Sequence, residues 1–297
     1  MKLSIALITM NREKQLIEAL QSCVDCELPL DTQFVIIDNG SSDNTESAVL
    51  DFFQKYPFEY YYEKLPINIG AGRGRNYAYL KSKGEYVYFL DDDAYIDKDC
   101  SDFFMQAIKI LDSDKRIATL TTQIYDLLWQ KNRVTTHGPL IHGEIKHCYM
   151  VCGGSHFLSR ECFKNASPYF LIEYGYEELK PSLLAVDLGY INAFVESLRV
   201  IHNPLVNKWD YRDKRNEELL VKVIALPCAI KTNFYPKILF PFVYFAYKLR
   251  CWKYLSKEQI IKANEIVNDV SNKFEWGDRI KLKSVIRMFC HFGIAVF

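Results

Sequence analysis

The amino-acid sequence predicts an α/β fold in its first two thirds and a helical region after it. From residue 3 to about residue 125, short apolar runs alternate with amphipathic segments, as in a mostly parallel sheet covered by helices. The charge also changes along the chain: residues 1–204 carry a net charge of −8, and residues 205–297 a net charge of +8. We therefore expect an α/β domain at 1–204 and a separate basic region at 205–297.

Each element follows from local periodicity. Strands are expected at residues 3–9, 34–37, 60–62, 86–90 and 118–125, where β-branched or aromatic residues run without Gly or Pro. One helix is expected from residue 11 onward, where apolar residues recur three and four apart. Three later helices are expected to end at about residues 55, 83 and 111. A loop and a hairpin follow in 127–147, and then a strand after Gly154. Another helix should begin near Lys180, because Pro181 is best tolerated in a first turn.

Composition limits the class of protein. The chain has 297 residues, of which 49% are hydrophobic, and its formal net charge is zero, which does not favour nucleic acid as a partner. The N-terminus does not resemble a signal peptide, and nine cysteines indicate reduced thiols and a cytoplasmic location. Cys23-x-x-Cys26 and Cys148-x3-Cys152 lack matching second pairs for zinc. No charge-free run approaches the roughly 20 residues of a membrane span.

Three consecutive carboxylates follow the strand at 86–90. Asp91 and Asp93 would share one face if the chain stayed extended, about 7 Å apart. Ligands of open α/β sheets bind at the carboxyl ends of the strands. A cation such as Mg²⁺ or Mn²⁺, shared with substrate phosphates, would offset the charge repulsion there. The alternative is an acidic surface turn.

Two further motifs lie at the same predicted edge. Asp38 ends the strand at 34–37, where its carboxylate could bind a nucleotide base or ribose, or cap the next helix. The loop Gly70-x-Gly72-x-Gly74 lets the backbone approach a ligand closely, with Arg73 and Arg75 facing a diphosphate. Its alternative is a flexible turn with two solvated arginines.

A pair of glutamates precedes the helix expected near Lys180. Glu177 and Glu178 could simply complement the helix dipole. Alternatively, one of them is a general base, because adjacent carboxylates raise one another's pKa toward neutral pH. Cys152-Gly153-Gly154 forms a turn before a strand, and His202 lies at the end of another strand.

Together these motifs resemble the family-2 inverting glycosyltransferases of the GT-A fold. The similarity covers Thr9-Met10-Asn11-Arg12, Asp38 to Thr45, Asn68-x-Gly70 through Arg75-Asn76, and Leu90-Asp91-Asp92-Asp93. It is strong over residues 1–100 and weaker to about residue 204. Where the family commonly has Glu-Asp, this chain has Glu177-Glu178.

The resemblance implies a nucleotide-sugar donor, with a UDP-sugar favoured, and Mn²⁺ or Mg²⁺ as cofactor. It implies that Glu178 is the base, with Glu177 on sugar or acceptor hydroxyls. The metal ligands would be Asp93, with Asp91 and His202. The nucleotide-sugar site would comprise Thr9, Asn11, Arg12, Asp38, Asn68, Gly70, Arg73, Arg75, Asn76, Asp91, Asp92, Gly153 and Gly154.

The implied function is transfer of one sugar to a glycan, glycolipid or protein acceptor in the synthesis of cell-surface glycans. No Gln-x-x-Arg-Trp pattern follows, which argues against a processive synthase. Two other readings stay open. One is a nucleotidyltransferase, which would release pyrophosphate, and the other is a non-catalytic sugar- or membrane-binding protein on the same scaffold.

The region after residue 205 indicates a different partner. Residues 219–257 contain seven Lys or Arg and no acidic residue. Aromatic residues are interleaved with these cations, at Phe234, Tyr235, Phe240, Phe242, Tyr244, Phe245, Tyr247, Trp252 and Tyr254. This pattern in short helices is typical of peripheral contact with an anionic membrane. The alternative is an ordinary helical appendage whose aromatic side chains pack on the sheet. Two further helices are expected at about 257–274 and 280–291.

Overall fold

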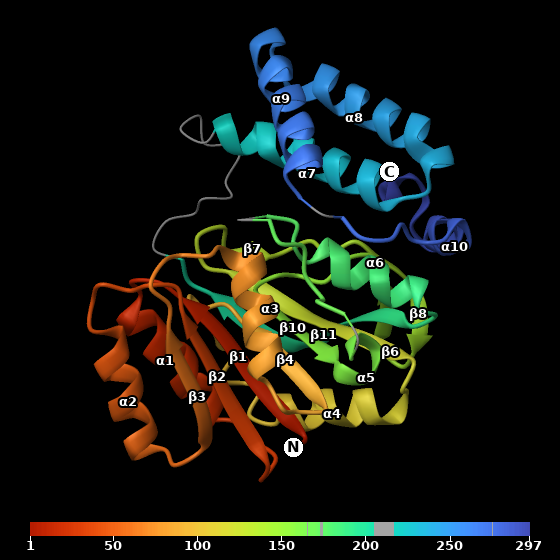
Figure 1. Cartoon of the computed structure of the whole chain (residues 1–297). Helices are drawn as coiled ribbons and strands as arrows, with labels where there is room; N and C mark the ends of the chain where they lie inside the picture. The colour runs from red at the N-terminus through yellow and green to blue at the C-terminus, as the bar shows by residue number, and fades with distance from the viewer. Residues whose placement is uncertain (165, 173–174, 205–216, 275) are drawn as a thin grey trace. The chain divides into compact units, whose positions relative to one another are not determined.

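The computed structural model describes residues 1–164, 166–172, 175–204, 217–274 and 276–297 (Figure 1). Its contacts divide the chain into two compact units, Met1–Leu205 and Val206–Phe297. The boundary expected after residue 204 falls where residues 205–216 begin, outside the described residues.

The first half of unit 1 is a parallel sheet with helical connections. β1 (Leu3–Thr9) lies between β2 (Thr32–Asp38) and β4 (Tyr86–Leu90), and β3 (Glu59–Lys64) pairs with β2, all in parallel. The connecting helices are α1 (Glu13–Val24), α2 (Thr45–Lys55) and α3 (Ala71–Lys81). The predicted alternation of strands and helices is confirmed here.

Beyond β4 the sheet becomes mixed. β10 (Ser155–Ser159) lies antiparallel between β4 and β6 (Ile117–Asp126), and β11 (Ile191–His202) runs parallel to β6. The full order is β3-β2-β1-β4-β10-β6-β11-β9-β8. The predicted hairpin is β8 (His137–His142) with β9 (Ile145–Cys148). The smaller elements are β5 (Ala94–Ile96), β7 (Lys131–Asn132), α4 (Phe103–Ser113), α5 (Arg160–Phe163) and α6 (Leu179–Asp187).

This topology gathers several strand ends at one edge. β1, β2 and β4 are parallel, and β6 and β11 run in the same direction because β10 is antiparallel to both β4 and β6. The residues that follow these five strands therefore lie at a common edge, where open α/β sheets bind their ligands.

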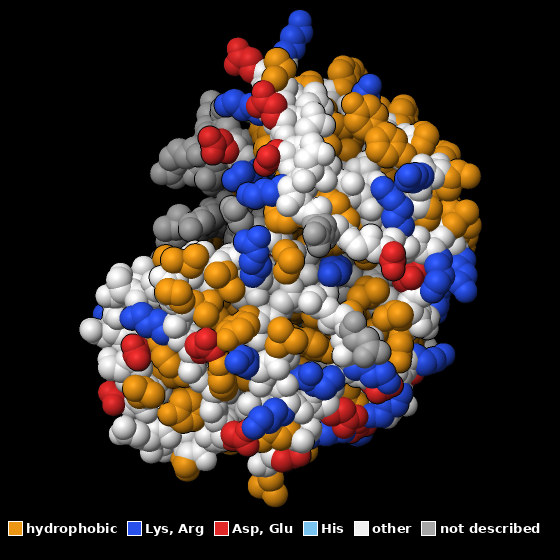
Figure 2. Space-filling view, in the orientation of Figure 1, with side chains coloured by type: hydrophobic (Ala, Val, Ile, Leu, Met, Phe, Trp, Pro, Cys, Tyr) orange, Lys and Arg blue, Asp and Glu red, His pale blue; other side chains and the backbone are white. Residues whose placement is uncertain are grey.

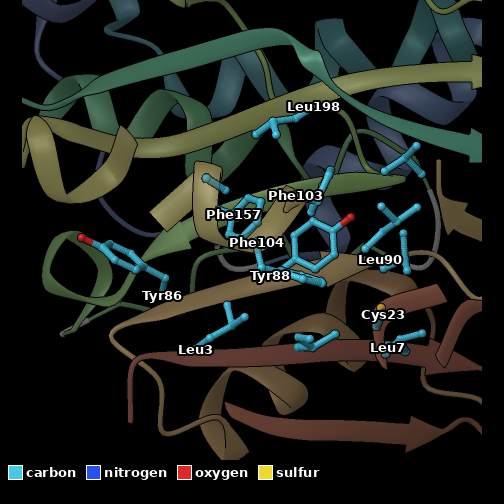
Figure 3. Close-up of a cluster of buried hydrophobic side chains, with 14 of the residues drawn as sticks. Leu3, Leu7, Cys23, Tyr86, Tyr88, Leu90, Phe103, Phe104, Phe157 and Leu198 are labelled. Carbon is cyan, nitrogen blue, oxygen red and sulfur yellow. The ribbon is translucent and has the colours of Figure 1, made fainter. Parts of the chain in front are cut away.

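An aromatic cluster fixes β4 against β10 and α4 (Figure 3). The buried Tyr88 ring lies 5.5 Å from Phe103, 5.3 Å from Phe104 and 4.4 Å from Phe157, measured between ring centroids. Its hydroxyl is 2.7 Å from Ser155 Oγ, so the one polar atom of the ring is satisfied. The cluster holds the strand that leads into the acidic triplet.

Unit 2 is helical in its described residues. It comprises α7 (Glu217–Phe234), α8 (Phe240–Tyr254), α9 (Lys257–Lys273) and α10 (Leu282–Phe292), with 3₁₀ turns η2 (Lys237–Leu239) and η3 (Gly293–Val296). A capping box starts α9: Gln259 N–H donates to Ser256 Oγ, and Ser256 N–H donates to Gln259 Oε1. None of the helices in the described ranges combines the length and apolar character needed to cross a bilayer.

We predict that Phe157→Ala destabilises unit 1. Truncating this fully buried ring should lower the free energy of unfolding by about 3–5 kcal/mol, because the neighbouring rings cannot close the cavity. Leu80→Ala is the control, since this α3 side chain is 69% exposed and should change stability little. Urea unfolding followed by circular dichroism measures both variants, and equal midpoints would contradict the proposed role of the cluster.

Candidate active site

The acidic triplet forms a turn and does not extend β4. β4 ends at Leu90, and Ala94 N–H donates to Asp91 O at 3.1 Å. The expectation that Asp91 and Asp93 share a strand face is therefore wrong, because period-two geometry ends with the strand. The carboxylates instead divide between two cations: Asp91 contacts Arg75, and Asp92 and Asp93 contact Arg12.

Arg12 neutralises two of the three carboxylates. Its Nη1 lies 2.7 Å from Asp92 Oδ1 and 2.6 Å from Asp93 Oδ2. Thr9 Oγ1 also donates to Asp92 Oδ2 at 2.7 Å. The segment that follows β1 thus holds the segment that follows β4, and four of the predicted site residues belong to one network.

Burial and partners affect these two carboxyls differently. Burial raises the pKa of Asp92 to about 6, although Arg12 opposes the rise. Burial also acts to raise the pKa of Asp93, but its hydrogen bond and charge interaction with His202, together with Arg12, outweigh it, so the pKa lies below its ordinary value. Of these two carboxyls, Asp93 therefore has the lower pKa and ionises more readily.

His202 connects Asp93 to a cluster that the sequence analysis missed. His202 Nε2 lies 3.3 Å from Asp93 Oδ1, and its Nδ1 lies 2.9 Å from Asp126 Oδ2. Arg133 Nη2 lies 2.7 Å from the same Nδ1 and 3.2 Å from Asp126 Oδ2. The sequence held one signal for this cluster, the carboxylate of Asp126 directly after the predicted strand at 118–125. In the structure this residue is buried and ends β6 at the same sheet edge.

The metal ligands implied by the resemblance are only partly brought together. Among the described residues, no group of three or more His, Cys, Asp or Glu side chains is placed to hold a metal ion. The Asp91 carboxylate contacts Arg75, so it is not grouped with the other two implied metal ligands. Asp93 and His202 remain adjacent, with Asp126 against the far nitrogen of the imidazole, which is a common outer-shell arrangement. A carboxylate and an imidazole suit Mn²⁺ or Mg²⁺ when phosphate oxygens and water complete the coordination.

Arg75 joins three carboxylates from distant parts of the chain. Its Nη2 lies 2.8 Å from Asp91 Oδ1, and its Nη1 lies 2.6 Å from Glu177 Oε1 and 2.8 Å from Glu178 Oε1. It also donates to Gly153 O at 3.2 Å. The side chain is only 9% exposed, so Arg75 does not face a diphosphate as expected. It orders the carboxylates instead.

The two glutamates differ in their surroundings. Glu177 Oε2 accepts from Gly175 N–H at 2.7 Å and its Oε1 from Arg75, so the expected contact of Glu177 with sugar hydroxyls is not favoured. Glu178 is the more exposed of the two. Burial, followed by the charge of Glu177, raises the pKa of Glu178 to about 8, against the effect of Arg75. A carboxyl with this pKa can accept a proton near neutral pH.

The segment after β2 is held by Asp38. Its Oδ1 accepts from Ser41 N–H at 2.7 Å, and its Oδ2 accepts from Tyr62 Oη at 2.9 Å. Asn11, at a left-handed φ of +54°, links the loops after β1 and β2 by accepting from Ser42 N–H at 2.7 Å. Asp38 is fully buried, but the N-cap residue of α2 is Asn44, so the alternative of a helix cap is not supported. Contact of Asp38 with a base stays a prediction.

The glycines of the 70–76 segment approach protein atoms. α3 already begins at Ala71, and a Cβ on Gly72 would lie 2.1 Å from Phe170 O. A Cβ on Gly74 would lie 3.1 Å from Ile8 Cγ2. The expectation of a loop that approaches a ligand is therefore wrong for these two glycines, because a helix packs there against β1 and the segment before α6.

The other predicted residues of this segment differ in whether their side chains are buried or exposed. Asn76 is buried and exchanges two hydrogen bonds of 3.0 Å with the backbone of Tyr169. Asn68 Oδ1 accepts from Gly70 N–H at 2.8 Å, and Gly70 has a φ of +84°, which favours glycine. Arg73 is exposed. Asn76 thus positions the chain around Tyr169, while Arg73 is the arginine that solvent or a ligand can reach.

Gly153 and Gly154 make room for neighbouring side chains. A Cβ on Gly153 would lie 2.1 Å from Glu178 Oε1, and a Cβ on Gly154 would lie 3.0 Å from Ile124 Cδ1 and 3.5 Å from Asp91 Oδ2. The space expected for the donor at Gly153 is therefore taken by the Glu178 carboxylate. Gly154 borders Asp91 and remains beside the site.

The mixed sheet, with this carboxylate-rich edge at the ends of its parallel strands, has the architecture of the GT-A fold. The chain is similar to the structure of Staphylococcus aureus TarS residues 1–349 in complex with UDP-GlcNAc, with a TM-score of 0.62 and 17% identity over 92% of this chain and 82% of that one. It is also similar to a Pyrobaculum calidifontis mannosyltransferase in complex with GDP-Man and Mn²⁺, with a TM-score of 0.61 and 16% identity over 100% and 81%. These similarities establish the fold.

Residues 4–149 match the model of glycosyl transferase family 2. It is 34% identical over 101 residues to the poly(ribitol-phosphate) β-N-acetylglucosaminyltransferase TarS of Staphylococcus aureus, covering 33% of this chain and 17% of the relative. It is 30% identical over 107 residues to the poly-β-1,6-N-acetyl-D-glucosamine synthase of Staphylococcus epidermidis, covering 36% and 25%. The aligned part thus spans a quarter or less of these relatives.

We predict that Arg75→Met destabilises unit 1 strongly. Removing the guanidinium leaves buried carboxylates without their cation, which should cost about 3–5 kcal/mol of unfolding free energy. Arg73→Met, two residues earlier on the exposed side of α3, is the matched control and should cost within about 0.5 kcal/mol. Chemical denaturation measures the difference, and an Arg75→Met variant as stable as Arg73→Met would refute the assigned role.

Proposed function

We propose that this chain transfers one sugar from a nucleoside diphosphate-sugar to an acceptor hydroxyl, with inversion at the anomeric carbon. The observation that carries the proposal is the placement of Glu178. Its carboxyl has a raised pKa and is separated from Asp91 of the acidic triplet by a single guanidinium, that of Arg75. A proton acceptor thus lies beside the edge that would hold the donor.

The chemistry assigned to these side chains is a direct displacement. The acceptor oxygen forms a bond to the anomeric carbon while the bond to the diphosphate oxygen breaks, and its electrons leave with the nucleoside diphosphate. Glu178 takes the proton of the acceptor hydroxyl. Arg75 holds Glu178 in position by a 2.8 Å contact. Burial of the site keeps competing water from the carboxylate.

The leaving diphosphate requires positive charge. Asp93 and His202 would hold Mn²⁺ or Mg²⁺, which when bound offsets charge on the diphosphate. Arg12, whose side chain is 32% exposed and contacts Asp93, would add a second positive charge beside the diphosphate.

The relatives support the substrate class. A structural neighbour was solved in complex with UDP-GlcNAc, and two relatives are named as a synthase of poly-β-1,6-N-acetyl-D-glucosamine and as a poly(ribitol-phosphate) β-N-acetylglucosaminyltransferase. We therefore propose a UDP-sugar donor and a surface glycan or glycolipid acceptor. A nucleotidyltransferase would instead release pyrophosphate from a nucleoside triphosphate, and a non-catalytic binding protein would turn over no donor.

We predict that Glu178→Gln abolishes transfer while leaving donor binding intact. Loss of a general base should lower kcat by about 10²–10⁴-fold. Glu161→Gln is the matched control, because this carboxylate on α5 is exposed and forms an ion pair with Lys164, which is not a candidate site residue. The assay measures release of nucleoside diphosphate from a panel of UDP-, GDP- and dTDP-sugars with Mn²⁺. Full activity of a folded Glu178→Gln variant would refute the assignment.

The pH dependence of the reaction should follow Glu178. Because the base must be deprotonated and burial raises its pKa to about 8, kcat/KM should rise with pH through an inflection near pH 8 and level off only at higher pH. Glu177→Gln removes the neighbouring charge that also raises this pKa, so its inflection should move to lower pH. A rate profile is the measurement, and an inflection unmoved by Glu177→Gln would contradict the coupling.

A further inference from the structure

α8 of unit 2 has two apolar faces, of which only one is buried. Val243, Tyr247 and Cys251 recur every four residues and are buried. The opposite face carries a stripe with spacings of three, four and three residues, formed by Phe242, Phe245, Leu249 and Trp252, all of them exposed. Phe245 is 64% exposed and Trp252 is 82% exposed. An α-helix of a soluble unit ordinarily places polar residues on such a face.

The apolar surface continues onto α10. Leu282, Ile286 and Phe289 are spaced four and three apart and are exposed. The Phe297 ring joins the two helices, because its centroid lies 5.8 Å from Phe242 and 6.0 Å from Phe289. We call these eight residues of α8, α10 and the C-terminus the apolar band. Figure 2 shows hydrophobic side chains gathered over α8 in unit 2.

Cations flank the apolar band. At 100° per residue, Lys248 and Lys253 lie on opposite sides of the α8 stripe, and Lys283 and Arg287 are exposed on α10. Arg250 Nη1 also donates to Phe297 O at 3.1 Å, within the band. Neither residues 219–257 nor residues 279–297 contain an acidic side chain. The surface therefore favours a partner that is apolar at its centre and anionic around it.

We propose that the apolar band binds the surface of an anionic lipid bilayer. Aromatic rings would enter the region between headgroups and acyl chains, and the flanking lysines and arginines would contact lipid phosphates. α8 would lie in the plane of the surface over its length of about 22 Å. This inference concerns unit 2 and does not depend on the proposed transferase reaction.

A second copy of the chain fits the apolar band less well. A two-fold contact through the band would place the same patch against itself, so Lys248 and Lys253 would meet like charges of the other copy. An anionic bilayer compensates these charges. Not all of the aromatic residues that the sequence suggested for membrane contact can reach a bilayer. Phe234, Tyr235 and Tyr247 are buried and belong to the core of the unit.

Vesicle co-sedimentation of the full chain tests the proposal. The chain should pellet with vesicles of phosphatidylcholine and phosphatidylglycerol, much less with phosphatidylcholine alone, and less as salt is added. Phe245→Ser/Trp252→Ser should weaken this partitioning at least tenfold. Ile261→Ser is the matched control, because this α9 residue is 60% exposed and lies outside the band.

A charge variant separates the two contributions. Lys248→Glu/Lys253→Glu should remove the preference for anionic vesicles, whereas Lys262→Glu on α9 should retain it. The proposal is overturned if the wild-type chain pellets with neither vesicle, or if Phe245→Ser/Trp252→Ser pellets like wild type. It is also overturned in favour of self-association if light scattering shows a dimer that the double serine variant loses while vesicles bind neither.

Discussion

The buried guanidinium of Arg75 is the interaction on which the site depends. It lies within 2.8 Å of carboxylate oxygens from Asp91, Glu177 and Glu178, which come from the end of β4 and from the segment before α6. Without a cation between them, these carboxylates would repel one another in a region of low dielectric. The arginine thus sets the position of the proposed base and connects it to the acidic triplet.

A second arginine organises the other half of the site. Arg12 holds Asp92 and Asp93, and Asp93 leads through His202 to Asp126. The triplet is therefore divided, with Asp91 on the side of the glutamates and Asp93 on the side of the imidazole. This division fits the proposal that one turn serves both the sugar and the diphosphate, because each end of the turn has its own cation and the intervening Asp92 is buried.

Local patterns predicted much of the fold and only part of the site. β1, β2, β4 and their connecting helices follow from periodicity, since each strand is a run of buried side chains. The orientation of Asp91 and Asp93 could not be predicted from periodicity, because the chain forms a turn there in which Ala94 N–H bonds to Asp91 O. The part played by Gly72 also required the fold, since the backbone atom it approaches is almost a hundred residues away. Asp126 and Arg133 belong to no local sequence motif. Their contacts with His202 could be recognised only once β6 and β11 were seen to pair.

The account's central claim is that this edge binds a nucleoside diphosphate-sugar together with a divalent ion. The most direct measurement is thermal unfolding of the full chain with UDP-, GDP- and dTDP-sugars, each with and without Mn²⁺. A ligand present at 100 times its Kd stabilises the folded state by about 2.7 kcal/mol, which such a measurement resolves. The account predicts stabilisation by one nucleotide class, dependent on Mn²⁺ and lost in Asp93→Ala. Unchanged unfolding with every donor, or stabilisation that Asp93→Ala retains in full, would contradict it.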